Sequence, residues 1–127
     1  MRKFVFAVLA GLMSSAAFAD NTVVTTADNG KAITLKVGQC LDVRLQTQAA
    51  STGYDWYLAP GMPEIMGLSG RTTTTPGDAP PGAPSQLDFV LCAEAPGSLT
   101  VKFLYYRIWE KNVPPAKELA FPVKITP

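Results

Sequence analysis

The sequence predicts an all-β protein with an immunoglobulin-like antiparallel β-sandwich fold. Apolar residues recur at every second position in seven short segments, and no segment of useful length shows the 3.6-residue period of a helix. Turn residues such as Gly, Pro, Asn and Asp separate these segments. Seven or so short strands in about 100 residues are typical of two antiparallel sheets packed face to face.

Four of the expected strands lie in the N-terminal half. Thr22–Thr26 is rich in Val and Thr, which favour strands, and an Asp-Asn-Gly turn follows it. Ala32–Val37 alternates and ends at a glycine. Cys40–Thr47 places two Leu and one Val on one face, and Tyr54–Leu58 places Trp56 between two other large side chains. Each segment therefore has one face suited to a core.

The remaining expected strands are Gln86–Glu94, Leu99–Tyr105 and Leu119–Ile125. Each carries Leu, Phe, Val or Ile at every second position, which supplies further apolar surface between two sheets. The stretch from Pro60 to Pro84 contains six Pro and five Gly, and we expect a long loop there. Within it, Arg71–Pro81 is predicted to be mobile in the free protein, because its Thr, Pro and Gly residues offer nothing to bury.

The first 19 residues are predicted to be a removable export signal. Arg2 and Lys3 precede the apolar run Phe4–Met13, and Ala17–Ala19 has the small residues of a cleavage site. The apolar run is too short to span a bilayer, which needs about 20 residues. Residues 20–127 are then expected to form one domain that is periplasmic or secreted.

Composition excludes several classes of protein. The chain has 11 basic and 10 acidic side chains, and loss of the two basic residues of the leader changes the net charge from +1 to −1. This balance argues against a nucleic-acid binder and against an electrostatic membrane binder. The chain has no His and no glycine-rich phosphate-binding motif. A Ser-His-Asp triad, a Cys-His pair and a His-bearing zinc site are therefore excluded, and we expect no cofactor and no metal.

An enzyme of this composition would have to act through carboxylates. Asp88 with Glu94, or Asp42 with Asp55, are the candidate acid pairs, but nothing in the pattern places either pair in a pocket. We therefore expect a secreted binding protein and no enzyme.

The two cysteines are expected to form a structural disulfide. Cys40 and Cys92 both have the opposite parity to the apolar residues of their strands, so both should point away from the core. In an immunoglobulin-like order these strands are antiparallel neighbours, and the start of one lies beside the end of the other. An exported chain meets an oxidising compartment, where the two thiols would pair.

The two tryptophans have different contexts. Trp56 alternates with apolar neighbours and is expected in the core. Trp109 follows Arg107 at a strand end, before charged residues. Arg and Trp are enriched in binding hot spots, so Trp109 is either a contact residue or an aromatic that covers one end of the sandwich.

Three segments carry a family resemblance. Ala49-Ala50-Ser51-Thr52-Gly53 is followed by an aromatic-x-Trp strand, Gly82-Ala83-Pro84-Ser85 precedes another strand, and Arg107-Ile108-Trp109 follows an aromatic strand. In this order they resemble the chagasin-like inhibitors of papain-type cysteine proteases, whose motifs are Asn-Pro-Thr-Thr-Gly, Gly-x-Gly-Gly and Arg-Pro-Trp. The resemblance extends from about Ala32 to Ile125. The departures are Ala49 and Ala50 for Asn and Pro, two lost glycines, and Ile108 for Pro.

The resemblance implies a monomeric, reversible, tight-binding inhibitor whose three loops occlude the cleft of a papain-like cysteine protease. It implies that the binding residues are Ala49, Ala50, Ser51, Thr52, Gly53, Gly82, Ala83, Pro84, Ser85, Arg107, Ile108 and Trp109. Loss of the prolines should weaken the ordering of two of these loops. The alternative is an exported binding module of the same fold that does not inhibit proteases.

Overall fold

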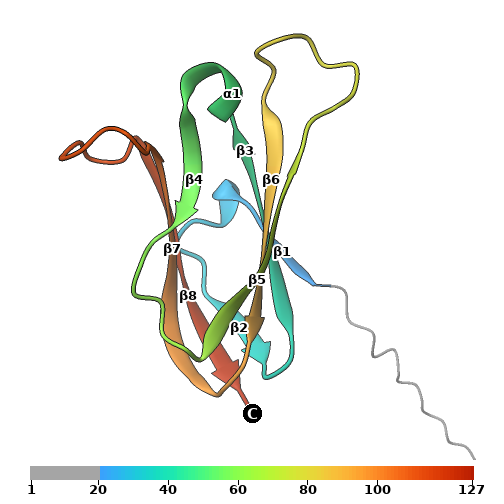
Figure 1. Cartoon of the computed structure of the whole chain (residues 1–127). Coiled ribbons are helices and arrows are strands. Elements are labelled where there is room, and N and C mark those ends of the chain that lie inside the picture. Colours follow the sequence, from blue (N-terminus) through green and yellow to red (C-terminus); the bar gives the residue numbers. More distant parts are fainter. Residues whose placement is uncertain (1–20) are drawn as a thin grey trace, which may run out of the picture.

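Two four-stranded sheets pack face to face in the computed structural model, which describes residues 21–127 (Figure 1). The export signal expected at residues 1–19 lies outside the described residues. The strands are β1 (Thr22–Val24), β2 (Ile33–Lys36), β3 (Cys40–Thr47), β4 (Tyr54–Leu58), β5 (Met66–Thr74), β6 (Ser85–Ala93), β7 (Gly97–Arg107) and β8 (Lys117–Thr126). Two short helical turns, η2 (Thr26–Asp28) and α1 (Ala49–Thr52), complete the described elements.

The strand order confirms the predicted sandwich. One sheet has the order β1-β3-β6-β5 and the other has the order β2-β8-β7-β4. The central pairs are antiparallel, and each sheet adds one parallel pair at an edge, β1 with β3 and β2 with β8. Neither helical turn in residues 21–127 has the length or the apolar character that crossing a membrane requires.

The core lies between the sheets and is built from alternate residues of the strands. The inward side chains of β3, β6, β7 and β8 are almost completely buried, as the two-residue alternation predicts. Phe89 and Phe103 meet across the two sheets with ring centroids 4.7 Å apart. Trp56 is 2% exposed, which confirms its predicted place in the core.

Two expectations for the chain near β1 and β5 were wrong. The first strand ends at Val24, because Thr25 caps the turn η2 with a reciprocal pair of hydrogen bonds to Asp28. The expected long loop from Pro60 to Pro84 contains β5, which pairs with β6 along its whole length. Arg71–Thr74 is therefore paired strand, whereas we expected mobile loop. The sequence of β5 shows no alternation of apolar and polar residues, because β5 lies at the edge of its sheet and buries only Met66.

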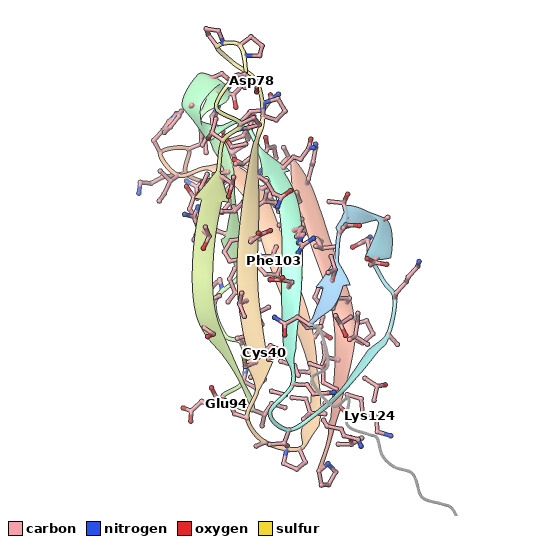
Figure 2. The ribbon with its side chains drawn as sticks, turned by 90° about the vertical axis from the view of Figure 1, so that its right-hand side faces the viewer. Cys40, Asp78, Glu94, Phe103 and Lys124 are labelled. Atoms are coloured by element: carbon pink, nitrogen blue, oxygen red, sulfur yellow. A yellow bond between two sulfur atoms is a disulfide. The ribbon has the colours of Figure 1, made fainter. Side chains whose placement is uncertain are left out.

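The two cysteines face each other on neighbouring strands. Cys40 in β3 is in register with Cys92 in β6, and their sulfurs form a disulfide. Both side chains lie on the outer side of the sheet, opposite in parity to the buried residues. The predicted disulfide is thus confirmed, and it indicates folding in an oxidising compartment outside the cytosol. Figure 2 shows Cys40 toward the end of the sandwich that bears Glu94 and Lys124.

This pairing has a direct chemical test. Both thiols should resist alkylation in the unreduced protein and should react fully after reduction, since each sulfur is bonded to the other. Intact mass measured with and without prior reduction checks the result. Alkylation of either cysteine without a reductant would contradict the pairing.

Candidate functional site

Three connecting segments lie together at one end of the sandwich, which we call the apex: residues 48–53, 75–84 and 108–116. The strand register places them there, because Thr47 pairs with Ser85 in one sheet and Tyr54 pairs with Arg107 in the other. In Figure 1 all three lie at the top, with α1 between the other two. The structure therefore brings the three predicted binding segments to one end. The disulfide lies toward the opposite end.

The first segment is a single helical turn. Thr52 and Gly53 donate their backbone N–H groups to the carbonyls of Gln48 and Ala49, at 2.9 and 3.0 Å. Gly53 ends the turn in the left-handed conformation, with φ 81°, which favours glycine. The Thr52 hydroxyl donates to Gln48 O at 2.9 Å, and the Thr47 hydroxyl accepts from the Ala49 N–H. Hydrogen bonds thus order this turn without the proline of the family motif.

Arg107 joins the end of β7 to this turn. Its Nε donates to the carbonyl oxygen of Thr52 at 2.9 Å, although the residues are 55 positions apart in sequence. Its guanidinium carbon lies 4.3 Å from the centroid of the Tyr54 ring, and its Nη1 lies 3.4 Å from a carboxylate oxygen of Glu110. The guanidinium is therefore held from three directions within the chain.

Trp109 rests on the same turn. The six-membered part of its indole lies so close to the α-carbon of Gly53 that a Cβ at position 53 would overlap the ring. Gly53 is thus required both for its backbone conformation and for its lack of a side chain. The indole remains 62% exposed, and Trp109 is consequently no part of the core.

An aromatic column supports this arrangement from below. Tyr54 stacks on Tyr105 with centroids 5.3 Å apart, and Tyr105 meets the buried Trp56 at 5.0 Å. The Trp56 indole N–H donates to Gln46 O, which fixes that ring in place. Burial raises the pKa of the Tyr105 phenol above its ordinary value, so this phenol stays neutral at physiological pH.

Asp55 connects the two sheets just beneath the apex. One carboxylate oxygen accepts the Thr47 hydroxyl at 2.6 Å and the other pairs with Arg71 at 2.9 Å. Thr47 belongs to β3, Asp55 to β4 and Arg71 to β5, so one carboxylate ties three strands together. No sequence pattern indicates this link, because Arg71 lies in the edge strand β5, which shows no alternation of apolar residues.

The apolar tip of the third segment is exposed. Six large apolar side chains in residues 21–127 are strongly exposed, and three belong to this segment: Ile108, Trp109 and Val113. The backbone is closed at its base by a hydrogen bond from the Ala116 N–H to Tyr105 O at 2.8 Å. Clustered apolar side chains on one exposed loop are typical of a protein-binding surface.

The second segment forms its own short turns above the ends of β5 and β6. Short turns form where Ala79 and Ala83 donate to the carbonyls of Pro76 and Pro80, and the hydroxyls of Thr75 and Ser85 lie 2.7 Å apart at the base. Nearly every side chain in this segment is exposed. Figure 2 shows Asp78 near the outer end of the apex.

Mobility was expected for Arg71–Pro81, but because residues 71–74 belong to β5, the expectation now applies to residues 76–81. Backbone order parameters from NMR of the free protein should be high for Arg71–Thr74, which is paired with β6, and low for residues 76–81. Uniformly high values through residues 76–81 would contradict the expectation.

The candidate acid pairs are not brought together. Asp42 and Asp88 lie on the outer side of one sheet, where both face Arg44, at 3.4 and 3.8 Å. Asp55 lies in the other sheet and is engaged by Thr47 and Arg71. In the part of the chain that the structure describes, Cys, Asp and Glu side chains form no cluster of three that could hold a metal ion.

Comparisons with known proteins identify relatives of this chain and of its fold. Residues 34–125 match the model of the chagasin family of peptidase inhibitors, I42. The fold is similar to the crystal structure of EhICP2, a cysteine protease inhibitor from Entamoeba histolytica. That match has a TM-score of 0.71 and 25% identity, and it covers 83% of this chain and 94% of that one. No curated protein sequence matches the chain.

Two further structures share the fold at lower identity. The solution structure of Amebosin matches with a TM-score of 0.67 and 19% identity, covering 85% of this chain and 100% of that chain. PbICP-C, whose structure is of its complex with falcipain-2, matches with a TM-score of 0.61 and 19% identity, over 92% of this chain and 96% of the other.

Proposed function

The chain belongs to the chagasin family of peptidase inhibitors, and we propose that its apex is the surface with which it inhibits papain-like cysteine proteases. It acts as an inhibitor and not as an enzyme. The proposed binding surface consists of residues 49–53, 82–85, 108 and 109, with Arg107 at the end of β7 directly beneath it. The observation that carries the proposal is the joining of the first and third segments into one exposed unit by Arg107 and Trp109.

The turn at residues 48–53 suits the blocking of a cleft without being cleaved. Ala49, Ala50 and Ser51 are exposed and small, so the backbone of the turn can approach a narrow cleft closely. The turn is helical and internally hydrogen-bonded, whereas a substrate of such a protease would lie extended along the cleft. Inhibition of this kind needs no reactive side chain and is therefore reversible.

The other two segments supply the flanking contacts. Trp109 and Ile108 present an apolar surface beside the turn, with the character of a hot spot. On the other side, residues 82–85 lead directly into β6, so their backbone can pair with an extended edge of the protease. Gly82 has φ 84° and open space around its α-carbon, so it permits a close approach there.

The site of action follows from the disulfide and the expected leader. A disulfide is stable outside the reducing cytosol. Together with the basic and apolar leader, it supports a periplasmic or secreted inhibitor.

Titration of residues 20–127 against a panel of proteases tests the proposal. We expect stoichiometric and reversible inhibition of papain-like enzymes, with falcipain-2 among those tested, and no effect on a serine protease. Recovery of protease activity on dilution, and recovery of the inhibitor at its original mass, would support cleft occlusion. If no papain-like protease is inhibited, the alternative of a non-inhibitory binding module is favoured.

A further inference from the structure

Arg107 is committed to contacts inside the chain. Its side chain is 33% exposed. Nε is bonded to Thr52 O, one face of the guanidinium lies on the Tyr54 ring, and Nη1 faces Glu110. A guanidinium held in this way has limited freedom to form a bidentate contact with a second protein.

We propose that Arg107 is a positioning residue that holds the turn at residues 48–53 in its inhibitory shape, and that it acts through the Thr52 carbonyl and not by contacting the protease. The inference rests on the proposed function, since it concerns how the same apex is assembled. It adds a contact between distant parts of the chain to the hydrogen bonds that order the turn locally.

The hydrogen bond from Arg107 to Thr52 O satisfies a carbonyl at the end of the helical turn. The last carbonyls of a helical turn have no partner within the turn, and Thr52 O is one of them. The bond from Nε is charge-assisted and joins the turn to the end of β7. β7 lies in the centre of its sheet, between β8 and β4, so the turn is anchored to a rigid part of the fold.

The support continues into the core. Arg107 rests on Tyr54, Tyr54 stacks on Tyr105, and Tyr105 meets Trp56, which is buried. The planar guanidinium can stack on the Tyr54 ring and at the same time donate from Nε to Thr52 O. A lysine could not replace Arg107 here, because its ammonium group is not planar and cannot make both contacts. Trp109 depends on the same arrangement, since its indole is seated on Gly53 at the end of the turn.

The proposal gives a quantitative relation between order and affinity. If loss of the Arg107 contact reduces the population of the inhibitory turn to about one-tenth, the apparent inhibition constant rises about tenfold. A closed population of about one-tenth corresponds to an open-to-closed ratio of about nine, so the turn amides of such a variant should lose nearly all their protection from hydrogen exchange.

Three variants of the exported domain test this relation. Arg107→Gln removes the charge and the fork of donors, and Arg107→Lys keeps the charge but loses the fork. Lys102→Gln is the matched control, because Lys102 lies on the same strand, is exposed, and also carries one positive charge.

Amide hydrogen exchange is measured at Thr52 and Gly53, whose N–H groups close the turn. Core amides of β7 report whether the fold is intact, and inhibition of one sensitive papain-like protease is measured in parallel.

We expect both Arg107 variants to lose nearly all protection from hydrogen exchange at Thr52 and Gly53, with unchanged core amides and an inhibition constant raised about tenfold. Lys102→Gln should change neither quantity. Unchanged hydrogen exchange at Thr52 and Gly53 in Arg107→Gln would overturn the proposal. Inhibition as strong as the wild type's by Arg107→Lys would also overturn it, because a positive charge alone would then be sufficient at position 107. If Arg107→Gln also loosens the core, Arg107→Lys decides the question. A wild-type protein that inhibits no protease would refute the proposed function, and the exchange data would still decide whether Arg107 holds the turn.

Discussion

Trp109→Ala should weaken inhibition of a sensitive papain-like protease by about 30-fold or more while leaving the urea midpoint nearly unchanged. The indole is 62% exposed, so its removal takes little buried surface from the folded protein. At the centre of an interface, truncation of a Trp typically costs about 2 kcal/mol or more of binding free energy, which corresponds to about 30-fold in the dissociation constant. Inhibition assays and urea titrations on the same preparation measure both quantities.

Val37→Ala is a suitable control for this substitution. Val37 is also an exposed apolar residue, but it lies beside Thr126 at the end opposite the apex, so its truncation should leave inhibition unchanged. If Trp109→Ala inhibits as well as the wild type, or if it unfolds the domain, the assignment of this loop to the interface is wrong.

Trp56→Ala should have the opposite effect, with a loss of about 3–5 kcal/mol in the free energy of unfolding. The side chain is 2% exposed, it supports Tyr105, and its indole N–H is bonded to Gln46 O. Removal would leave a cavity and would remove the hydrogen bond to Gln46 O, and both changes destabilise a folded domain.

The expected measurement is a lower urea midpoint for Trp56→Ala, with inhibition retained under conditions where the variant is folded. Trp56→Phe keeps most of the volume but loses the N–H donor, so its loss of stability should be smaller. A Trp56→Ala variant as stable as the wild type would contradict the structure of the core.

The fold could be predicted because alternation reports burial directly. Seven of the eight strands carry enough buried residues, or enough β-branched residues, to be recognised from sequence. Parity predicted that Cys40 and Cys92 both point outward, and the immunoglobulin-like strand order predicted that their strands are neighbours. β5 was missed because a strand at the edge of a sheet exposes nearly all its side chains and so shows no alternation. Its Gly, Ser and Thr residues resemble those of a loop.

The site could be predicted in outline but not in its connections. The residues of the three segments were identified from the resemblance, and the strand order brings them to one end. The bond from Arg107 to Thr52 O joins residues 55 positions apart through a backbone atom, and no side-chain pattern records such a contact. The contact of the Trp109 ring with Gly53 likewise depends on how the loops pack, which the spacing of residues in the sequence does not show.

The central claim is that the apex is the protease-binding surface, and chemical-shift mapping tests it most directly. An isotope-labelled sample of residues 20–127 is titrated with a papain-like protease whose catalytic cysteine has been replaced, so that the complex is not processed. Amide signals of residues 48–53, 82–85 and 107–110 should shift or broaden, while those of Cys40, Cys92 and Lys124 at the opposite end should remain unchanged. Perturbations confined to that opposite end or to the outer face of a sheet, with the apical signals unmoved, would contradict the account.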